Sequence, residues 1–231
     1  MVIRNLLFDL DETLFDFHRA EAIALRRALE SLGITPTEEI VVRYSAINDS
    51  QWKRLELGEI NRDEVTLGRF GILFREFGLD ASQEAMRDAY EGFLGEGHYY
   101  IEGAEALLER LAPAYRLYLV SNGTARVQRS RIASAGLEKY FREIFISQEI
   151  GHNKPDRAFF DFCFARIPEF SREETVIVGD SLTSDIRGGN NAGIRTCWFN
   201  PAGKENTADV RVDWEIARLD ELPGIWEKEK L

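Results

Sequence analysis

The stretch Leu6-Leu7-Phe8-Asp9-Leu10-Asp11-Glu12-Thr13 decides both the fold and the chemistry of this chain. Its apolar residues predict a buried strand. Two carboxylates and a hydroxyl follow at two-residue steps, so all three can converge on one small volume. Such a carboxylate pair suits phosphoryl transfer, because Asp9 can attack phosphorus as a nucleophile. Asp11 can protonate the leaving oxygen and later deprotonate the attacking water.

Three further predicted strands also end in polar residues. Residues 116–120 run into Ser121-Asn122-Gly123, a short strand at Ile144 precedes Asn153-Lys154-Pro155-Asp156, and residues 175–178 run into Gly179-Asp180-Ser181 and then Asp185. In an open parallel sheet, ligands bind outside the carboxyl ends of the strands, where the strand order reverses. We therefore expect the four polar clusters to form one site.

Between the first two strands the sequence pattern is helical throughout. Apolar spacing and glycine stops predict four helices, at residues 17–32, 36–58, 62–77 and 82–94. From Gly103 onward, predicted helices at 104–111, 125–135, 157–167 and 184–192 alternate with the strands, of which the last covers 196–199. This alternation is typical of parallel strands joined by crossover helices.

The predicted fold class is therefore α/β, with a Rossmann-like parallel-sheet core domain and an inserted four-helix cap domain. We assign residues 1–15 and 100–231 to the core domain and residues 16–99 to the cap domain. The two linkers between them would be hinges for a lid that closes on the substrate.

Composition limits the partners and the compartment. The 231 residues, 44% of them hydrophobic, suffice for a core domain and a small accessory domain. A net charge of −11 disfavours bulk attraction to nucleic acid or to an anionic membrane, so the site must supply its own positive charge. No apolar stretch approaches membrane-spanning length, and Cys163 and Cys197 indicate no disulfide framework. We expect a cytoplasmic protein that acts on a small molecule, and no protein partner is implied.

The order of the acid pair, Ser-Asn-Gly, Lys-Pro and Gly-Asp-x-x-x-x-Asp resembles the haloacid dehalogenase-like (HAD) hydrolase superfamily over nearly the whole chain. Within the superfamily, Asp11 makes the chain similar to the phosphatase and phosphomutase branches, because the haloacid dehalogenases lack an acid at that position. The resemblance thus implies phosphate-ester chemistry and argues against carbon–halogen cleavage.

Four clustered carboxylates require a cation. Two unit charges ~4 Å apart repel by ~4 kcal/mol at an effective dielectric constant of 20. Oxygen ligands with few protein groups suit Mg²⁺. The resemblance implies that the ligands are the carboxylates of Asp9 and Asp180 and the backbone carbonyl of Asp11, with Asp185 as a further ligand or an orienting group.

The phosphoryl group needs donors as well. Ser121 can hydrogen-bond a phosphoryl oxygen, and the amides of Asn122 and Gly123 lie where a strand passes into a helix, an arrangement that binds anions. Lys154 would supply a fixed positive charge to the phosphoryl oxygens and the nucleophile. Thr13 would hold the catalytic loop and the phosphoryl group.

Several segments are similar to HAD enzymes that hydrolyse pyrimidine nucleoside 5′-monophosphates as house-cleaning nucleotidases. These are Asp11-Glu12-Thr13-Leu14-Phe15, Ala46-Ile47-Asn48 with Trp52 and Gly58, Gly68-Arg69-Phe70, and Thr196-Cys197-Trp198-Phe199-Asn200. A base can stack on Trp52 or Phe15 and hydrogen-bond to Asn48. The position of Trp52 on the apolar stripe of its helix nevertheless favours a place in the lid core.

Other functions remain open at this point. A phosphomutase would share every core residue and differ in how well the closed lid excludes water. A phosphatase of phosphoglycolate or a sugar phosphate is the rival among hydrolases. A non-catalytic binding protein on the same fold is disfavoured by the intact acids Asp9 and Asp11.

Overall fold

Six parallel strands form the centre of the structure, a computed structural model that describes residues 2–228. The strands are β1 (Asn5–Phe8), β2 (Arg116–Ser121), β3 (Glu143–Ile146), β4 (Thr175–Gly179), β5 (Arg195–Phe199) and β6 (Trp214–Ile216). Their order in the sheet is β3-β2-β1-β4-β5-β6, and every neighbouring pair is parallel. The predicted α/β class with a Rossmann-like sheet is confirmed.

The register of the sheet brings the polar strand ends together. Phe8, the last residue of β1, pairs with Leu119 of β2 on one side and Val178 of β4 on the other. The chain continues from β1 to β2 and β3 on one side and returns to β4 on the other, so the strand order reverses at β1. The residues that follow β1, β2 and β4 therefore lie at the switch point of the sheet.

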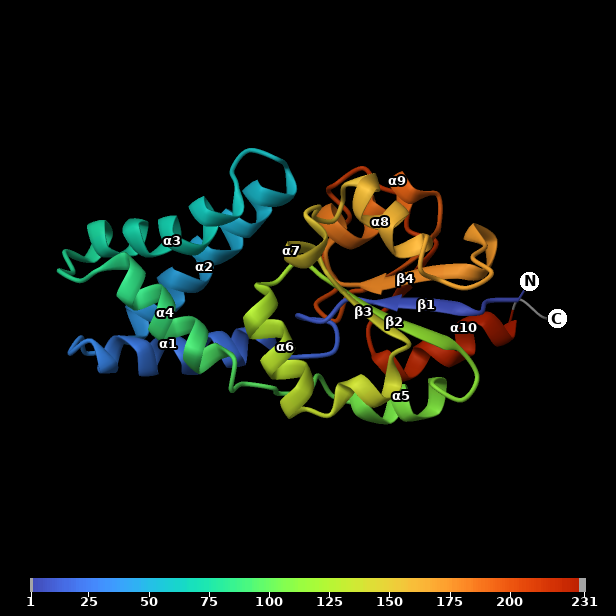
Figure 1. The fold of residues 1–231 in the computed structure, drawn as a ribbon, viewed down its shortest axis with the longest axis horizontal. Helices are drawn as coiled ribbons and strands as arrows, with labels where there is room; N and C mark the ends of the chain where they lie inside the picture. The colour runs from blue at the N-terminus through green and yellow to red at the C-terminus, as the bar shows by residue number, and fades with distance from the viewer. Residues whose placement is uncertain (1, 229–231) are drawn as a thin grey trace.

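Helices cover both faces of this sheet (Figure 1). One face carries α5 (Ala104–Leu111), α6 (Ala125–Ser134) and α10 (Leu222–Lys228), and the other carries α8 (Arg157–Phe164) and α9 (Arg187–Ala192). Side chains alternate along β1, so Leu6 and Phe8 pack in the first apolar cluster and Leu7 packs in the second. Together the two clusters bury both faces of the sheet.

Four further helices, which we call the cap helices, lie between β1 and α5 in the sequence and at one end of the molecule (Figure 1). They are α1 (Phe17–Ser31), α2 (Glu38–Glu56), α3 (Arg62–Phe77) and α4 (Gln83–Leu94). They have their own apolar cluster, in which Tyr44, Phe70 and Tyr90 pack ring against ring. The division into domains at residues 15/16 and 99/100 remains a prediction.

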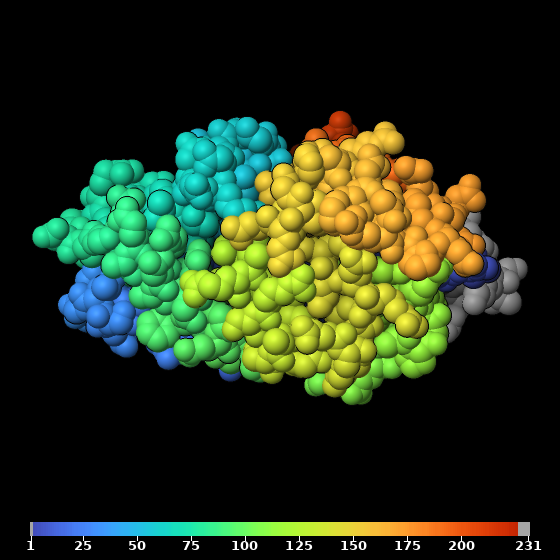
Figure 2. Space-filling model, viewed as in Figure 1, coloured from blue at the N-terminus to red at the C-terminus, as the bar shows by residue number. Residues whose placement is uncertain are grey.

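The cap helices contact the core along the face shown in Figure 2. Between the two parts, Glu91 of α4 forms an ion pair with Arg126 of α6 at 3.4 Å. The two connections between cap helices and core run side by side, because the backbone N–H of Asp16 donates to the carbonyl of Tyr99 at 2.8 Å. This pairing fixes where α1 leaves the core.

Some elements differ from the sequence-based expectation. The predicted helix at 184–192 begins as a π-helical segment, Leu182–Ile186, before α9. A short helix α7 (Ser147–Ile150) and strand β6 were not predicted. Residues 229–231 of the predicted core domain lie outside the described residues. Within residues 2–228 the structure contains no helix long and apolar enough to cross a membrane.

Candidate active site

Lys154 lies at the centre of the candidate active site. Its ammonium donates hydrogen bonds to Asp9 Oδ1 at 2.6 Å, to Asp185 Oδ1 at 2.7 Å and to the carbonyl of Val120 at 2.9 Å. The Lys154 side chain is only 1% exposed. Burial alone would lower the pKa of Lys154, but the carboxylates of Asp185 and Asp9 outweigh it and raise the pKa above its usual value. The lysine is therefore a fixed cation beside Asp9.

Three carboxylates converge beside this lysine. One oxygen atom from each of Asp9, Asp180 and Asp185 lies within 4.8 Å of the others. Burial raises the pKa of Asp9 to about 8, and the charges of Asp185 and Asp11 add to the rise while Lys154 opposes it. Burial, followed by repulsion from Asp9 and Asp185, likewise raises the pKa of Asp180 well above its usual value. One ammonium does not offset this negative charge, and the all-oxygen donor set fits a hard divalent cation such as Mg²⁺.

Asn122 holds the backbone of Lys154. The side-chain oxygen of Asn122 accepts from the Lys154 N–H at 2.9 Å, and its Nδ2 donates to the Lys154 carbonyl at 2.9 Å. Both polar groups of the amide are thus used to fix the loop that carries the lysine. The sequence predicted a phosphate-binding amide at this position and gave no sign of this second contact.

Ser121 and Asp11 are joined by a glutamine from α6. Nε2 of Gln128 donates to Ser121 Oγ at 2.8 Å and to Asp11 Oδ2 at 2.7 Å. Ser121 Oγ also accepts from the Gly123 N–H at 3.1 Å, so its own O–H is left to donate to a ligand. A side chain at Gly123 would place Cβ 2.3 Å from Gln128 Nε2, which explains the glycine.

Arg131, also on α6, pairs with the other oxygen of Asp11. Its Nη1 lies 2.5 Å from Asp11 Oδ1 and 3.0 Å from Gln128 Oε1, and its Nε donates to the carbonyl of Gly97 at 2.7 Å. The Arg131 side chain is 1% exposed, whereas that of Asp11 is 28% exposed. The arginine therefore fixes the Asp11 carboxylate from the interior and leaves part of it open to the site.

Asp180 is held from two sides. Its backbone carbonyl accepts a hydrogen bond from the indole of Trp198 at 2.8 Å, and its Oδ1 accepts from Thr13 Oγ1 at 3.5 Å. Thr13 is fully buried and does not line the cavity described next. Thr13 thus contacts Asp180, and its role toward the phosphoryl group remains a prediction.

A cavity of about 810 Å³ joins this site to the cap helices. The predicted site residues that line it are Asp9, Asp11, Ser121, Asn122, Gly123, Lys154, Asp180 and Asp185. The cap helices contribute Phe17, His18, Asn48, Asp49, Trp52, Lys53, Glu56, Arg69, Glu91 and Leu94. Its size is within the range of small-molecule sites, ~300–1,000 Å³.

The three predicted specificity residues occupy different positions. Trp52 is half-buried and lines the cavity, outside the apolar cluster of the cap helices. Asn48 also lines it, but its amide is already hydrogen-bonded to Glu21 and Arg69. The expected contact of Phe15 with a base is wrong for this structure, because Phe15 is fully buried with its ring edge-on to Tyr100 at 5.3 Å.

Two further residues line the cavity, Glu12 in the turn that follows β1 and His18 in the first turn of α1. Glu12 has a positive φ of 58°, a conformation that favours glycine, and its carboxylate accepts from the His18 N–H at 2.9 Å. His18 is half exposed, as expected, and lies 3.7 Å from Glu21. The nearby carboxylate of Glu21, followed by the charges of Glu12 and Asp49, raises the pKa of His18 to about 9.

Sequence reasoning missed several side chains that organise the site. Gln128 and Arg131 lie three residues apart on one face of a helix predicted correctly, yet nothing in the pattern shows that this face meets Asp11. Arg62, the first residue of α3, was also missed. It donates to the Asn122 carbonyl at 2.8 Å and to Ser147 Oγ and Asn153 Oδ1 at 2.7 Å each. These contacts connect elements far apart in sequence.

Comparison with known proteins places the chain in a family. A family model described as haloacid dehalogenase-like hydrolase matches residues 6–199. The HAD-hydrolase YfnB of Bacillus subtilis is 43% identical over 95% of this chain and 93% of that protein. The pyrimidine 5′-nucleotidase PynA of Streptococcus pneumoniae is 38% identical over 96% of this chain and 94% of its own length.

Structural comparison agrees with this placement. A crystal structure of B. subtilis YfnB bound to magnesium superposes with a TM-score of 0.93 and 42% identity, over 97% of this chain and 99% of that one. The chain therefore belongs to the haloacid dehalogenase-like hydrolase family.

Proposed function

We propose that this phosphoric monoester hydrolase is a Mg²⁺-dependent phosphatase that cleaves a pyrimidine nucleoside 5′-monophosphate through an aspartyl-phosphate on Asp9. The observation that carries the proposal is the contact between Asp9 and the buried Lys154 ammonium, 2.6 Å apart, at the edge of a large cavity. The acid is partly exposed to that cavity, its side chain being 11% exposed, so it can reach a phosphorus atom.

The first step forms a bond between a carboxylate oxygen of Asp9 and phosphorus, and the ester P–O bond breaks. Asp11 donates its proton to the leaving nucleoside oxygen. In the second step water attacks the phosphorus, Asp11 takes up the proton of the water, and the bond to Asp9 breaks. Inorganic phosphate leaves and the Asp9 carboxylate is restored.

Side chains of this chain would stabilise the charge that develops on the phosphoryl oxygens. Lys154 provides a positive charge, and Ser121 has its O–H free to donate. Asp9, Asp180 and Asp185 would hold Mg²⁺, which when bound neutralises carboxylate and phosphoryl charge. Gln128 and Arg131 would keep Asp11 turned toward the leaving group.

The nucleotide assignment has separate support. One cavity of about 810 Å³ is lined both by the residues of the phosphoryl site and by Trp52 and Asn48 of α2. The relative PynA is a pyrimidine 5′-nucleotidase by name, and it covers nearly the whole chain. An aromatic face and a set of hydrogen-bonding side chains are the features that bind a base.

A panel of phosphate esters tests this function. With Mg²⁺ we expect uridine and thymidine 5′-monophosphates to have a higher kcat/KM than phosphoglycolate or sugar phosphates, and a chelator to remove the activity. Preference for phosphoglycolate or a sugar phosphate would overturn the nucleotide assignment. Release of an isomerised sugar phosphate instead of free phosphate would identify a phosphomutase.

A further inference from the structure

Arg69 on α3 is a buried cation in the cap wall of the cavity. The residue is 3% exposed and lines the cavity. Within residues 2–228, no carboxylate lies at ion-pair distance from its guanidinium, although buried arginines are normally paired with an acid. The guanidinium instead lies over the rings of Tyr90 and Phe70, at 4.9 and 5.1 Å from their centroids. Such a group still has the capacity to bind an acceptor.

The orientation of this guanidinium is fixed by a chain of hydrogen bonds. Nη1 of Arg69 donates to Asn48 Oδ1 at 2.7 Å, and Nδ2 of Asn48 donates to Glu21 Oε1 at 2.7 Å. Because arginine only donates and an ionised glutamate only accepts, the amide of Asn48 has a single possible orientation. Nε of Arg69 also donates to the carbonyl of Thr66 at 3.3 Å. Two buried side chains and one backbone carbonyl therefore orient Arg69.

One donor of Arg69 is left for a ligand. Among the described residues, none accepts a hydrogen bond from Nη2. The other cationic cap side chains that line the cavity, Lys53 and His18, are more exposed than Arg69. At this position the wall thus offers an N–H donor, which selects a substrate with an acceptor there. Every pyrimidine base carries a ring carbonyl oxygen, whereas adenine has none.

We propose that Arg69, positioned by Asn48 and Glu21, is a specificity-determining residue that donates a hydrogen bond to a carbonyl oxygen of the nucleobase. The proposal rests on the proposed function, because it assumes that the phosphoryl group of the same substrate lies at Asp9. In this proposal Arg69 of α3 recognises the base by its carbonyl oxygen, and Trp52 of α2 contacts the face of the base ring.

The test compares two substrates that share the phosphoryl and sugar groups. Uridine 5′-monophosphate carries the base, and ribose 5-phosphate does not. In the Arg69→Gln enzyme we expect kcat/KM for uridine 5′-monophosphate to fall by about 10- to 100-fold, while kcat/KM for ribose 5-phosphate stays unchanged. A merely structural role of Arg69 would lower both values together.

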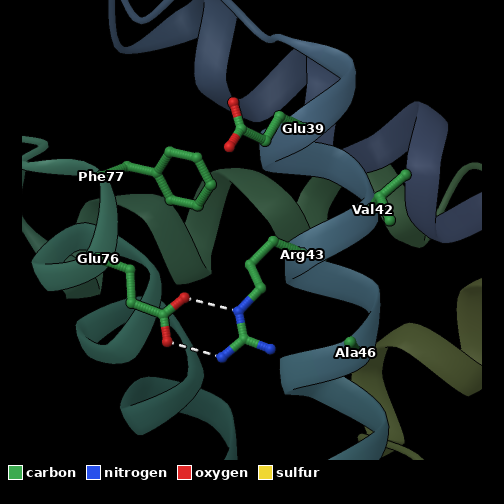
Figure 3. A pocket seen from close by; sticks show the side chains of 6 residues that line it. All are labelled: Glu39, Val42, Arg43, Ala46, Glu76 and Phe77. Atoms are coloured by element: carbon green, nitrogen blue, oxygen red, sulfur yellow. Dashed lines mark hydrogen bonds and ion pairs between the residues drawn. The ribbon is translucent and has the colours of Figure 1, made fainter.

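A matched control is available on the outer side of the cap helices. Arg43 of α2 forms two hydrogen bonds with Glu76 of α3, at 2.6 and 2.7 Å, in a groove between the two helices (Figure 3). This groove shares no lining residue with the active-site cavity. Arg43→Gln should therefore leave both substrates at wild-type kcat/KM.

The outcomes separate this inference from the proposed function. A wild-type enzyme that treats both substrates alike would overturn the nucleotide assignment. A wild type that prefers uridine 5′-monophosphate, with the same preference in Arg69→Gln, would overturn the role of Arg69. If circular dichroism shows that Arg69→Gln does not fold, the same two substrates are compared in Arg69→Lys. Lysine keeps the positive charge but lacks the planar guanidinium. We expect Arg69→Lys to lose the preference for uridine 5′-monophosphate as well.

Discussion

At the scale of single residues, the candidate site is organised around the charge of Lys154. Its ammonium contacts two acids and a carbonyl in the interior. Burial, together with the neighbouring carboxylates, raises the pKa values of Asp9 and Asp180 beside it. The lysine could be predicted from its motif, because it follows a short strand and precedes a proline. Its contact with Asp185 could not, because that depends on how the π-helical segment turns after β4.

Arg131 offers a test of how Asp11 is held. We expect Arg131→Met to lower kcat by about 10- to 100-fold, because Asp11 then lacks the partner that orients it, and acid–base catalysis contributes ~10²–10⁴-fold. Steady-state kinetics on the preferred ester measures this. Arg129→Met is the control on the same helix, since Arg129 is 43% exposed and pairs with Glu149 away from the cavity. Equal loss in both variants would contradict a specific role for Arg131.

His18 gives a pH-dependent contribution to stability. Its pKa rises from 6.5 to about 9 in the folded protein, chiefly through the nearby carboxylate of Glu21. The stabilisation is fully present below the unfolded pKa and is lost as the pH rises through the folded one. Urea unfolding of wild type and His18→Gln should therefore show a difference in unfolding free energy at about pH 6 that disappears at about pH 9.5. A difference of the same size at both values would contradict the assigned pKa.

At the scale of elements, the close approach of Asp185 to the end of β4 requires a glycine at position 179. A Cβ at this position would lie 2.3 Å from the carboxylate of Asp185. Gly179→Ala should displace that acid and raise the Mg²⁺ concentration needed for half-maximal activity, which a metal titration of the reaction rate measures. Gly92→Ala in α4 is the control, because a Cβ there meets nothing within 4 Å. Unchanged metal dependence in Gly179→Ala would show that Asp185 does not assist metal binding.

Most helices and strands could be predicted because apolar spacing carries the information. The predicted helices 62–77 and 104–111 coincide with α3 and α5. Strand β6 is only three residues long and has no apolar run to identify it. Phe15 was misassigned because the chain turns at residues 12–14 and places the Phe15 ring in the core, edge-on to Tyr100. Strand patterns do not encode that turn.

At the scale of the whole molecule, cap helices and core complete the cavity together. Arg62 crosses from α3 to the loops that carry Asn122 and Asn153, and Glu56 of α2 accepts a hydrogen bond from Thr183 of the core. The polar strand ends could be predicted to meet, because the carboxyl ends of parallel strands share one edge. The contacts between the cap helices and the core could not be predicted, because they depend on how these two parts pack against each other.

Metal binding should stabilise the whole protein. Mg²⁺ at ~100 times its Kd adds about 2.7 kcal/mol to the free energy of unfolding, which corresponds to an increase of about 5 to 10 °C in Tm. A thermal unfolding series with and without Mg²⁺ measures this. Asp180→Asn should lose most of the increase, and Asp80→Asn, on an exposed loop, should keep it. The same increase in both variants would place the ion elsewhere.

The most direct test of the account is to detect the phosphoryl group on Asp9. The enzyme is mixed with uridine 5′-monophosphate and Mg²⁺, quenched in acid within one turnover, and analysed by peptide mass spectrometry. We predict one added phosphoryl group on the peptide that contains Asp9, and neither adduct nor turnover in a folded Asp9→Asn variant. Turnover by that variant, or a phosphoryl group found on another residue, would contradict the account.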